Sequence, residues 1–221
     1  MSKMFSVKSE QNTGLLLRDY LTMSQHPDHQ ASNQNEPSNA RHDTSSTRSA
    51  STEEHRAQSP KSVRVFVLTV SDTRTAEDDR GGALIKELLA QSGHQLIGSQ
   101  IVRDERGSLV SAVQTASDGI SDPEVIIVTG GSGIGARDQT PEALRPLLSK
   151  EMPGFGEVFR VLSYQKIGAA TILSRAFAGV IGRTLLFVLP GSVNAVQLAM
   201  EKLIIPELGH LVREVRPERR Q

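Results

Sequence analysis

The sequence predicts an α/β fold with a mostly parallel sheet, and three observations support this prediction. Short apolar runs of strand length alternate with longer amphipathic segments of helical period, as expected for repeated strand–helix units. A polar or glycine-rich turn follows each apolar run. Residues 1–60 show neither pattern, so we expect the fold to occupy the remainder of the chain, over 61–217.

Composition separates a polar tail from a single folded domain. Residues 1–60 are dense in Ser, Asn, Gln and Thr and nearly lack apolar β-branched and aromatic residues after Tyr20, which predicts a disordered tail. Residues 61–217 are rich in Val, Ile and Leu and are enough for one core. We therefore expect two parts, a tail and one domain.

Charge and cysteine content exclude several classes of function. The chain of 221 residues carries 25 basic and 25 acidic side chains, so its net charge gives no reason to expect nucleic acid or a membrane as a partner. It contains no cysteine, which excludes disulfides, thiolate metal sites and a cysteine nucleophile. A cytoplasmic location fits this composition.

Two strand–helix units open the expected domain. The apolar run from Val63 to Val70 is typical of a strand buried on both faces. From Gly82 to Gln91 the apolar residues recur on one helical face, and Gly93 marks the end of that helix. A second strand is expected over 95–102. Asp104 follows it as the cap of the next helix, as a carboxylate that faces a ligand, or as both.

A glycine-rich turn follows the third strand, which is expected over 125–128. Gly130, Gly131, Gly133 and Gly135 permit positive φ angles and leave backbone N–H groups available to an anion. At the carboxyl end of a parallel strand, such a turn is the usual place for a phosphate-bearing ligand. A tight connection without any ligand is the alternative interpretation.

The residues after this turn indicate a cation beside the phosphate. A carboxylate at Asp138 would repel a bound phosphate unless Mg²⁺ lay between them, and Arg137 offers a forked donor. Thr140 is expected to cap a helix over 141–149, with Pro141 at its first position. The sequence contains no P-loop motif, and its glycines do not match the dinucleotide fingerprint.

The second half of the domain is less regular. A proline- and glycine-rich stretch precedes a helical run expected over 158–164. Residues 169–182 mix small and apolar side chains, so a buried helix and a binding loop are both open there. A last strand is expected over 184–189 and a closing helix over 194–208.

The polar turns are expected to meet in one pocket. They follow the strands at Ser71, Asp104, Gly130 and Pro190, and the carboxyl ends of parallel strands lie at the same edge of a sheet. Arg175, which stands between apolar residues, is either a structural ion-pair partner or an anion ligand.

Five motifs of the domain occur together in a fixed order. They are TGGSG at 129–133, RDQTPEAL at 137–144, MPGFGEVFR at 152–160, LSRAFAG at 173–179 and LPGS at 189–192. In order and spacing they resemble the molybdenum cofactor biosynthesis proteins of the Mog and MoaB type, which share the molybdopterin-binding domain also found in gephyrin. The resemblance covers about 61–210 and leaves out the tail.

This resemblance implies a three-layer α/β/α sandwich that binds molybdopterin and, in its catalytic members, transfers AMP from Mg-ATP to the terminal phosphate with release of pyrophosphate. Asp104 and Asp138 match the two active-site carboxylates of the family, and we expect them to hold Mg²⁺. The positions that match the phosphate-binding turn and the rest of the pocket are Gly130, Gly131, Ser132, Gly133, Ser71, Asp72, Thr140, Glu142, Ser174, Arg175, Gly191 and Ser192.

Departures from the family pattern leave two functions open. The final loop reads PGSVNA, so Asn194 stands where many relatives have lysine, and GFGEVFR resembles the MoaB branch. An active molybdopterin adenylyltransferase is the preferred hypothesis. The alternative is a binding protein that holds molybdopterin or a related pterin without turning over ATP, and a nicotinamide-dependent oxidoreductase is a third class. The resemblance also implies a homotrimer or homohexamer and a partner enzyme that inserts molybdate.

Overall fold

The computed structural model describes residues 58–219, and the expected tail lies outside this range except for its last residues. Those residues pack on the domain. Gln58 accepts a hydrogen bond of 3.1 Å from Nη2 of Arg213, Ser59 and Pro60 are buried, and a Cβ on Gly209 would lie 2.5 Å from the Pro60 carbonyl oxygen. Within the described range, no helix has the length and apolarity needed to span a membrane.

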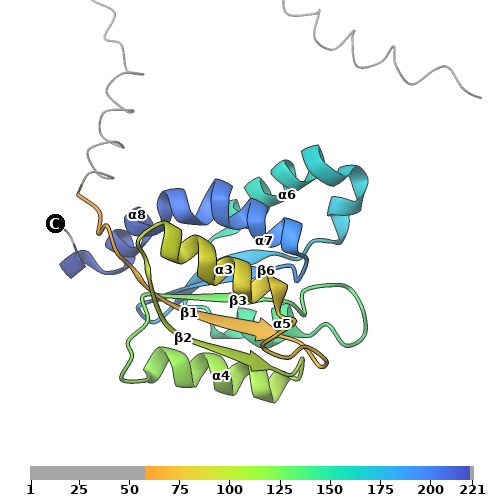
Figure 1. Cartoon of the computed structure of the whole chain (residues 1–221), viewed down its shortest axis with the longest axis horizontal. Helices are drawn as coiled ribbons and strands as arrows, with labels where there is room; N and C mark the ends of the chain where they lie inside the picture. The colour runs from red at the N-terminus through yellow and green to blue at the C-terminus, as the bar shows by residue number, and fades with distance from the viewer. Residues whose placement is uncertain (1–57, 220–221) are drawn as a thin grey trace, which may run out of the picture. The chain divides into compact units, whose positions relative to one another are not determined.

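The domain is built on one six-stranded, mostly parallel sheet, as predicted (Figure 1). The first strand pairs in parallel with the second and the third, and the third pairs in parallel with the sixth. Two further strands add in antiparallel fashion at the other edge. In spatial order the strands are β2 (Gln95–Val102), β1 (Arg64–Val70), β3 (Val125–Thr129), β6 (Thr184–Leu189), β5 (Phe177–Ile181) and β4 (Lys150–Glu151).

Helices cover both faces of this sheet, which confirms the three-layer sandwich (Figure 1). Side chains of β3 alternate between the two cores: Val125 and Ile127 face one helical layer, while Ile126 and Val128 face the other. The first layer contains α3 (Arg80–Gln91), α6 (Pro153–Ile167), α7 (Val193–Ala199) and α8 (Ile205–Val215), and the second contains α4 (Arg106–Asp118) and α5 (Thr140–Leu144).

Prolines explain where the observed helices differ from the expected ones. The helix expected over 141–149 ends as α5 at Leu144, and a short 3-10 turn with Pro146 follows it. Conversely, α6 begins at Pro153, because proline suits the first turn of a helix. The closing helix continues past Pro206 to Val215.

A π-helical segment, Met200–Ile204, lets the last helix continue through Pro206. Proline has no N–H to donate, and its ring clashes with the carbonyl four residues earlier, here that of Lys202. A wider turn in this region avoids that clash. The expected end of this helix at 208 was therefore wrong.

Two strands were not predicted. Within 169–182, the chain forms a 3-10 segment over Gly168–Leu173 and then β5, so neither a buried helix nor a simple loop describes it. The short β4 pairs with β5, where a Cβ on Gly179 would lie 2.4 Å from the Lys150 carbonyl oxygen.

Candidate functional site

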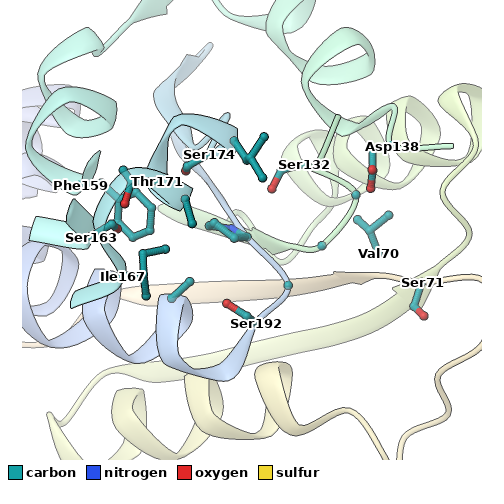
Figure 2. A pocket seen from close by; sticks show the side chains of 18 of the residues that line it. Val70, Ser71, Ser132, Asp138, Phe159, Ser163, Ile167, Thr171, Ser174 and Ser192 are labelled. Carbon is teal, nitrogen blue, oxygen red and sulfur yellow. The ribbon is translucent and has the colours of Figure 1, made fainter. Parts of the chain in front are cut away.

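A cavity of about 460 Å³ opens where β1, β3 and β6 reach their carboxyl ends. The turns after these three strands meet there, as the sequence predicts for a parallel sheet. Figure 2 shows Asp138 and Ser71 toward one end of the cavity and Phe159, Ser163 and Ile167 toward the other. One end thus carries a carboxylate, whereas the other combines the apolar side chain of Ile167 with the hydroxyls of Ser163 and Thr171, over the buried ring of Phe159.

The glycine turn after β3 forms the floor between these ends. Gly130 has a φ of 106°, and a Cβ there would lie 2.3 Å from the carbonyl oxygen of Val70. Gly131 has a φ of 61°. Only glycine can adopt the φ angle of Gly130 in the space beside the Val70 carbonyl, so this turn requires glycine at position 130.

Three successive N–H groups of this turn are free. Those of Gly131, Ser132 and Gly133 donate to no acceptor among residues 58–219, and all three residues line the cavity. Unpaired N–H groups on a glycine turn form a concave site for an anion. This part of the site is therefore suited to a phosphate.

Asp138 brings a carboxylate to the same cavity. Its Oδ2 accepts a hydrogen bond of 2.8 Å from the N–H of Gly135. A Cβ on Gly133 would lie 2.6 Å from this oxygen, so the turn wraps closely around the carboxylate. The close fit fixes Asp138 relative to the free N–H groups.

Asp104 lies behind the turn and does not line the cavity. Its Oδ1 accepts a hydrogen bond of 3.1 Å from the N–H of Gln139, and its Oδ2 would lie 2.5 Å from a Cβ on Gly131. The prediction that it caps the next helix was wrong, because Glu105 occupies the N-cap position and makes no side-chain cap bond.

The surroundings of Asp104 disfavour its charged form, chiefly through burial. Burial raises the pKa of the Asp104 carboxyl, and the charges of Asp138 and Asp72 raise it further, against lowering by the Gln139 N–H and by Arg175. Asp72 is linked to Asp104 directly, since its Oδ1 accepts a hydrogen bond of 3.2 Å from the Asp104 backbone N–H. A cation in this region would favour the charged form of Asp104.

Arg175 holds the glycine turn in shape. Its Nε donates to the carbonyl of Ser132 at 3.2 Å, its Nη2 donates to the carbonyl of Asp138 at 3.0 Å, and its Nη1 pairs with Glu142. The same ion pair lowers the pKa of the Glu142 carboxyl. Arg175 does not line the cavity, which agrees with the interpretation as a structural ion-pair partner.

Two buried hydroxyl groups lack partners. Thr140 is the first residue of α5 and not its cap; its N–H donates to the Gly131 carbonyl at 3.0 Å, and its Oγ1 is buried without a hydrogen bond in the described part of the chain. Thr171 Oγ1 is likewise unpaired, and this residue lines the cavity. An unsatisfied buried hydroxyl at a cavity wall indicates a position for a polar ligand atom.

The final loops complete the polar end. Ser71 Oγ accepts hydrogen bonds from the N–H groups of Thr73 at 3.2 Å and Arg74 at 3.0 Å. Nη2 of Arg74 donates to the carbonyl of Gly191 at 3.3 Å, which ties the turn after β1 to the turn after β6. Among the described residues, Arg74 is the only cationic side chain that lines this cavity.

The predicted site residues thus divide into two groups. Those that line the cavity are Ser71, Gly130, Gly131, Ser132, Gly133, Asp138, Ser174, Gly191 and Ser192. Those that lie outside its lining are Asp72, Asp104, Thr140, Glu142 and Arg175. Sequence reasoning missed Arg74 and the wall formed by Phe159, Ser163, Ile167 and Thr171.

The carboxylates suit a divalent cation that is shared with a substrate. Within residues 58–219, no three His, Asp or Glu side chains form a ready metal cage. Mg²⁺ commonly binds through one or two carboxylates and completes its coordination with water and substrate phosphates. Asp138, which lines the cavity, fits that mode, and Asp104 lies behind the same turn as a second carboxylate.

Known proteins similar to this chain agree with one another. A family described as the probable molybdopterin binding domain matches residues 66–210. Molybdenum cofactor biosynthesis protein B of Halalkalibacterium halodurans is 52% identical over 170 residues, an alignment that covers 76% of this chain and 99% of the relative. The protein of the same name from Bacillus subtilis is 50% identical over 170 residues, again covering 76% and 99%.

Solved structures show the same likeness. The crystal structure of a molybdenum cofactor biosynthesis protein B is 48% identical, with a TM-score of 0.69, and the match covers 72% of this chain and 99% of that one. The tungsten cofactor synthesizing protein MoaB from Pyrococcus furiosus is 41% identical, with a TM-score of 0.64 and coverage of 71% and 99%.

Proposed function

The chain belongs to the probable molybdopterin binding domain family, and on that premise we propose that it acts in molybdenum cofactor biosynthesis as a molybdopterin adenylyltransferase. The proposed reaction transfers AMP from Mg-ATP to the terminal phosphate of molybdopterin and releases pyrophosphate. The names of its relatives support the pathway.

One observation carries the proposed reaction: free N–H groups and a carboxylate share a wall of one cavity. The N–H groups of Gly131, Ser132 and Gly133 suit a phosphate, while Asp138 beside them would repel it. The two features are compatible when a divalent cation neutralises the charge between them. A site that only bound a phosphate would not need Asp138.

Each part of the site has a distinct role in the proposed reaction. The glycine turn holds the molybdopterin phosphate so that one of its oxygens faces the α-phosphorus of ATP. Asp138, with Asp104 behind it, would hold Mg²⁺, which supplies charge neutralisation at the phosphate oxygens. Arg175 keeps the turn and Asp138 in position through their carbonyl groups. No protein nucleophile is required.

Pyrophosphate release from Mg-ATP, measured with and without added molybdopterin, tests this function. Asp138→Asn keeps the shape of the side chain but removes its charge, so we expect turnover to fall about 10²- to 10³-fold while molybdopterin affinity changes little. Asp118→Asn, at the end of α4, is the matched control and should behave as wild type. Undiminished release by the Asp138 variant would disprove the role given to this carboxylate.

A second candidate function is pterin binding without turnover. It is favoured by the shortage of cations, since among the described residues only Arg74 lines the cavity with a positive charge, and Nη2 of Arg74 already donates to Gly191. Molybdopterin binding by wild type without any release of pyrophosphate would establish it. The same assay therefore decides between the two candidates.

We also propose that the protein forms homo-oligomers through α6. Val158, Val161 and Tyr164 recur at helical spacing and are 46%, 60% and 63% exposed. A contiguous exposed apolar face of this kind is unusual for a monomer. Self-association would cover this face. Light scattering measures the molar mass of wild type and of Val161→Glu in solution, and a smaller mass for the variant would show that this face is responsible.

A further inference from the structure

A second hollow adjoins the cavity and lies between α6 and the helical segment that begins with α7. It has a volume of about 470 Å³. Ser163, Ile167, Ser192 and Ala195 line both hollows, so the two share one boundary. A ligand that fills the first could therefore extend into the second.

The charge of this second hollow differs from that of the first. Lys166 and Lys202 line it, and neither forms an ion pair with any residue in the described part of the chain. Its one carboxylate, Glu201, accepts a hydrogen bond of 2.9 Å from Gln197 on the same helix. The hollow thus presents two free cations, one on each wall.

The backbone under one of these lysines is unusual. Lys202 lies within the π-helical segment Met200–Ile204. Such segments are rare and frequently occur at functional sites. Pro206 accounts for the segment locally, and Lys202 within it lines the hollow.

The proposed reaction needs what the second hollow offers. It brings two phosphate-bearing substrates together, yet the first cavity is within the range of roughly 300–1,000 Å³ typical of a single ligand. That cavity also supplies one arginine against the combined negative charge of both substrates. Further space and further cations are required nearby.

Resting on the proposed function, we propose that the hollow between Lys166 and Lys202 binds the β- and γ-phosphates of ATP. In the reaction, a phosphate oxygen of molybdopterin forms a bond to the α-phosphorus, and the bond from the α-phosphorus to its bridging oxygen breaks. Pyrophosphate leaves with that electron pair. The two lysines stabilise the charge on the departing group, in the hollow that adjoins the cavity of the attacking phosphate.

The test compares nucleotides that differ in these phosphates. Calorimetric titration with Mg-ATP and with AMP is carried out on wild type, on the double variant Lys166→Gln/Lys202→Gln and on the control Lys150→Gln, an exposed lysine of β4. We expect the double variant to bind Mg-ATP about tenfold more weakly and AMP as wild type does. Its Mg-ATP affinity should also depend less on KCl concentration, because two screened charges are gone.

Other outcomes would overturn either the phosphate site or the reaction on which it rests. Unchanged Mg-ATP affinity in the double variant excludes a phosphate site at these lysines, and weaker binding of molybdopterin alone would assign the hollow to the pterin. Lysine-dependent Mg-ATP binding in a wild-type protein that releases no pyrophosphate would leave the site intact and disprove the reaction. If wild type released pyrophosphate and the lysine substitutions had no effect, the reaction would stand and the phosphate site at the lysines would be disproved.

Discussion

At the scale of single residues, Asp104 links stability to the site. Burial raises the pKa of its carboxyl, and Asp138 and Asp72 add to this effect. A carboxyl group with a raised pKa binds its proton more tightly in the folded protein than in the unfolded chain. The free energy of unfolding therefore falls as the pH rises above the ordinary value of 3.8, and the loss persists at neutral pH.

We accordingly predict that Asp104→Asn raises the melting temperature at pH 7. The amide oxygen can still accept the hydrogen bond from Gln139, while the charge that the surroundings disfavour is absent. The gain should disappear in acid, where the wild-type carboxyl is protonated, and Asp118→Asn should show no such dependence. Scanning calorimetry across this pH range measures it, and a variant less stable than wild type at pH 7 would contradict the prediction.

At the scale of elements, the sequence predicts β1, β3 and β6, which are buried on both faces, and also the largely exposed edge strand β2. In β1, β3 and β6 a continuous apolar run is the direct consequence of helices on either side. β5 was not predicted, in part because it contains Gly179, which is unusual in a strand. A glycine is required there because the carbonyl of Lys150 in β4 approaches it closely. A contact made by a residue so distant in sequence leaves no local pattern.

The residues of the site likewise differ in how well the sequence could predict them. The glycine turn, Ser71 and Ser192 could be predicted because a turn after a parallel strand has a known position in the fold, whereas Ser174 came only from the family resemblance. Phe159 and Ser163 could not, because a helical face that borders a cavity has the same apolar spacing as one that borders a core. Helical periodicity shows which face of a helix is turned away from solvent, but it does not show whether that face borders a core or a cavity.

Arg175 connects two elements, and its substitution tests the stiffness of the glycine turn. Arg175→Lys keeps the charge, but one ammonium cannot reproduce the fork that contacts Ser132, Asp138 and Glu142. We predict that pyrophosphate release falls about tenfold or more through kcat, with little change in Mg-ATP affinity. Glu142→Gln, which leaves both carbonyl contacts in place, should lose less. A lysine variant that bound Mg-ATP poorly but kept its kcat would instead mark Arg175 as a ligand.

At the scale of the whole domain, the candidate site and the ion pairs of the C-terminal segment lie at opposite ends of the parallel strands. The carboxyl ends of the parallel strands surround the cavity. The amino ends are tied to the C-terminal segment by ion pairs: Arg216 contacts both oxygens of Asp122 at 2.8 Å, and Nε of Arg219 lies 2.6 Å from Glu124. Changes on that side are therefore expected to alter melting far more than turnover.

Removal of the N-terminal segment separates these two properties. A chain that starts at residue 58 keeps the hydrogen bond from Arg213 to Gln58 and the buried Ser59 and Pro60, so it should melt as the full chain does. Starting at residue 61 removes these contacts over Gly209 of α8 and should lower the free energy of unfolding by roughly 1–3 kcal/mol. Both should release pyrophosphate at the wild-type rate below their melting temperatures, since every residue found to line the cavity, from Val70 to Ala195, is retained. Calorimetry and the release assay on the two truncations decide this, and a fall in rate at unchanged melting temperature would show that the segment reaches the site.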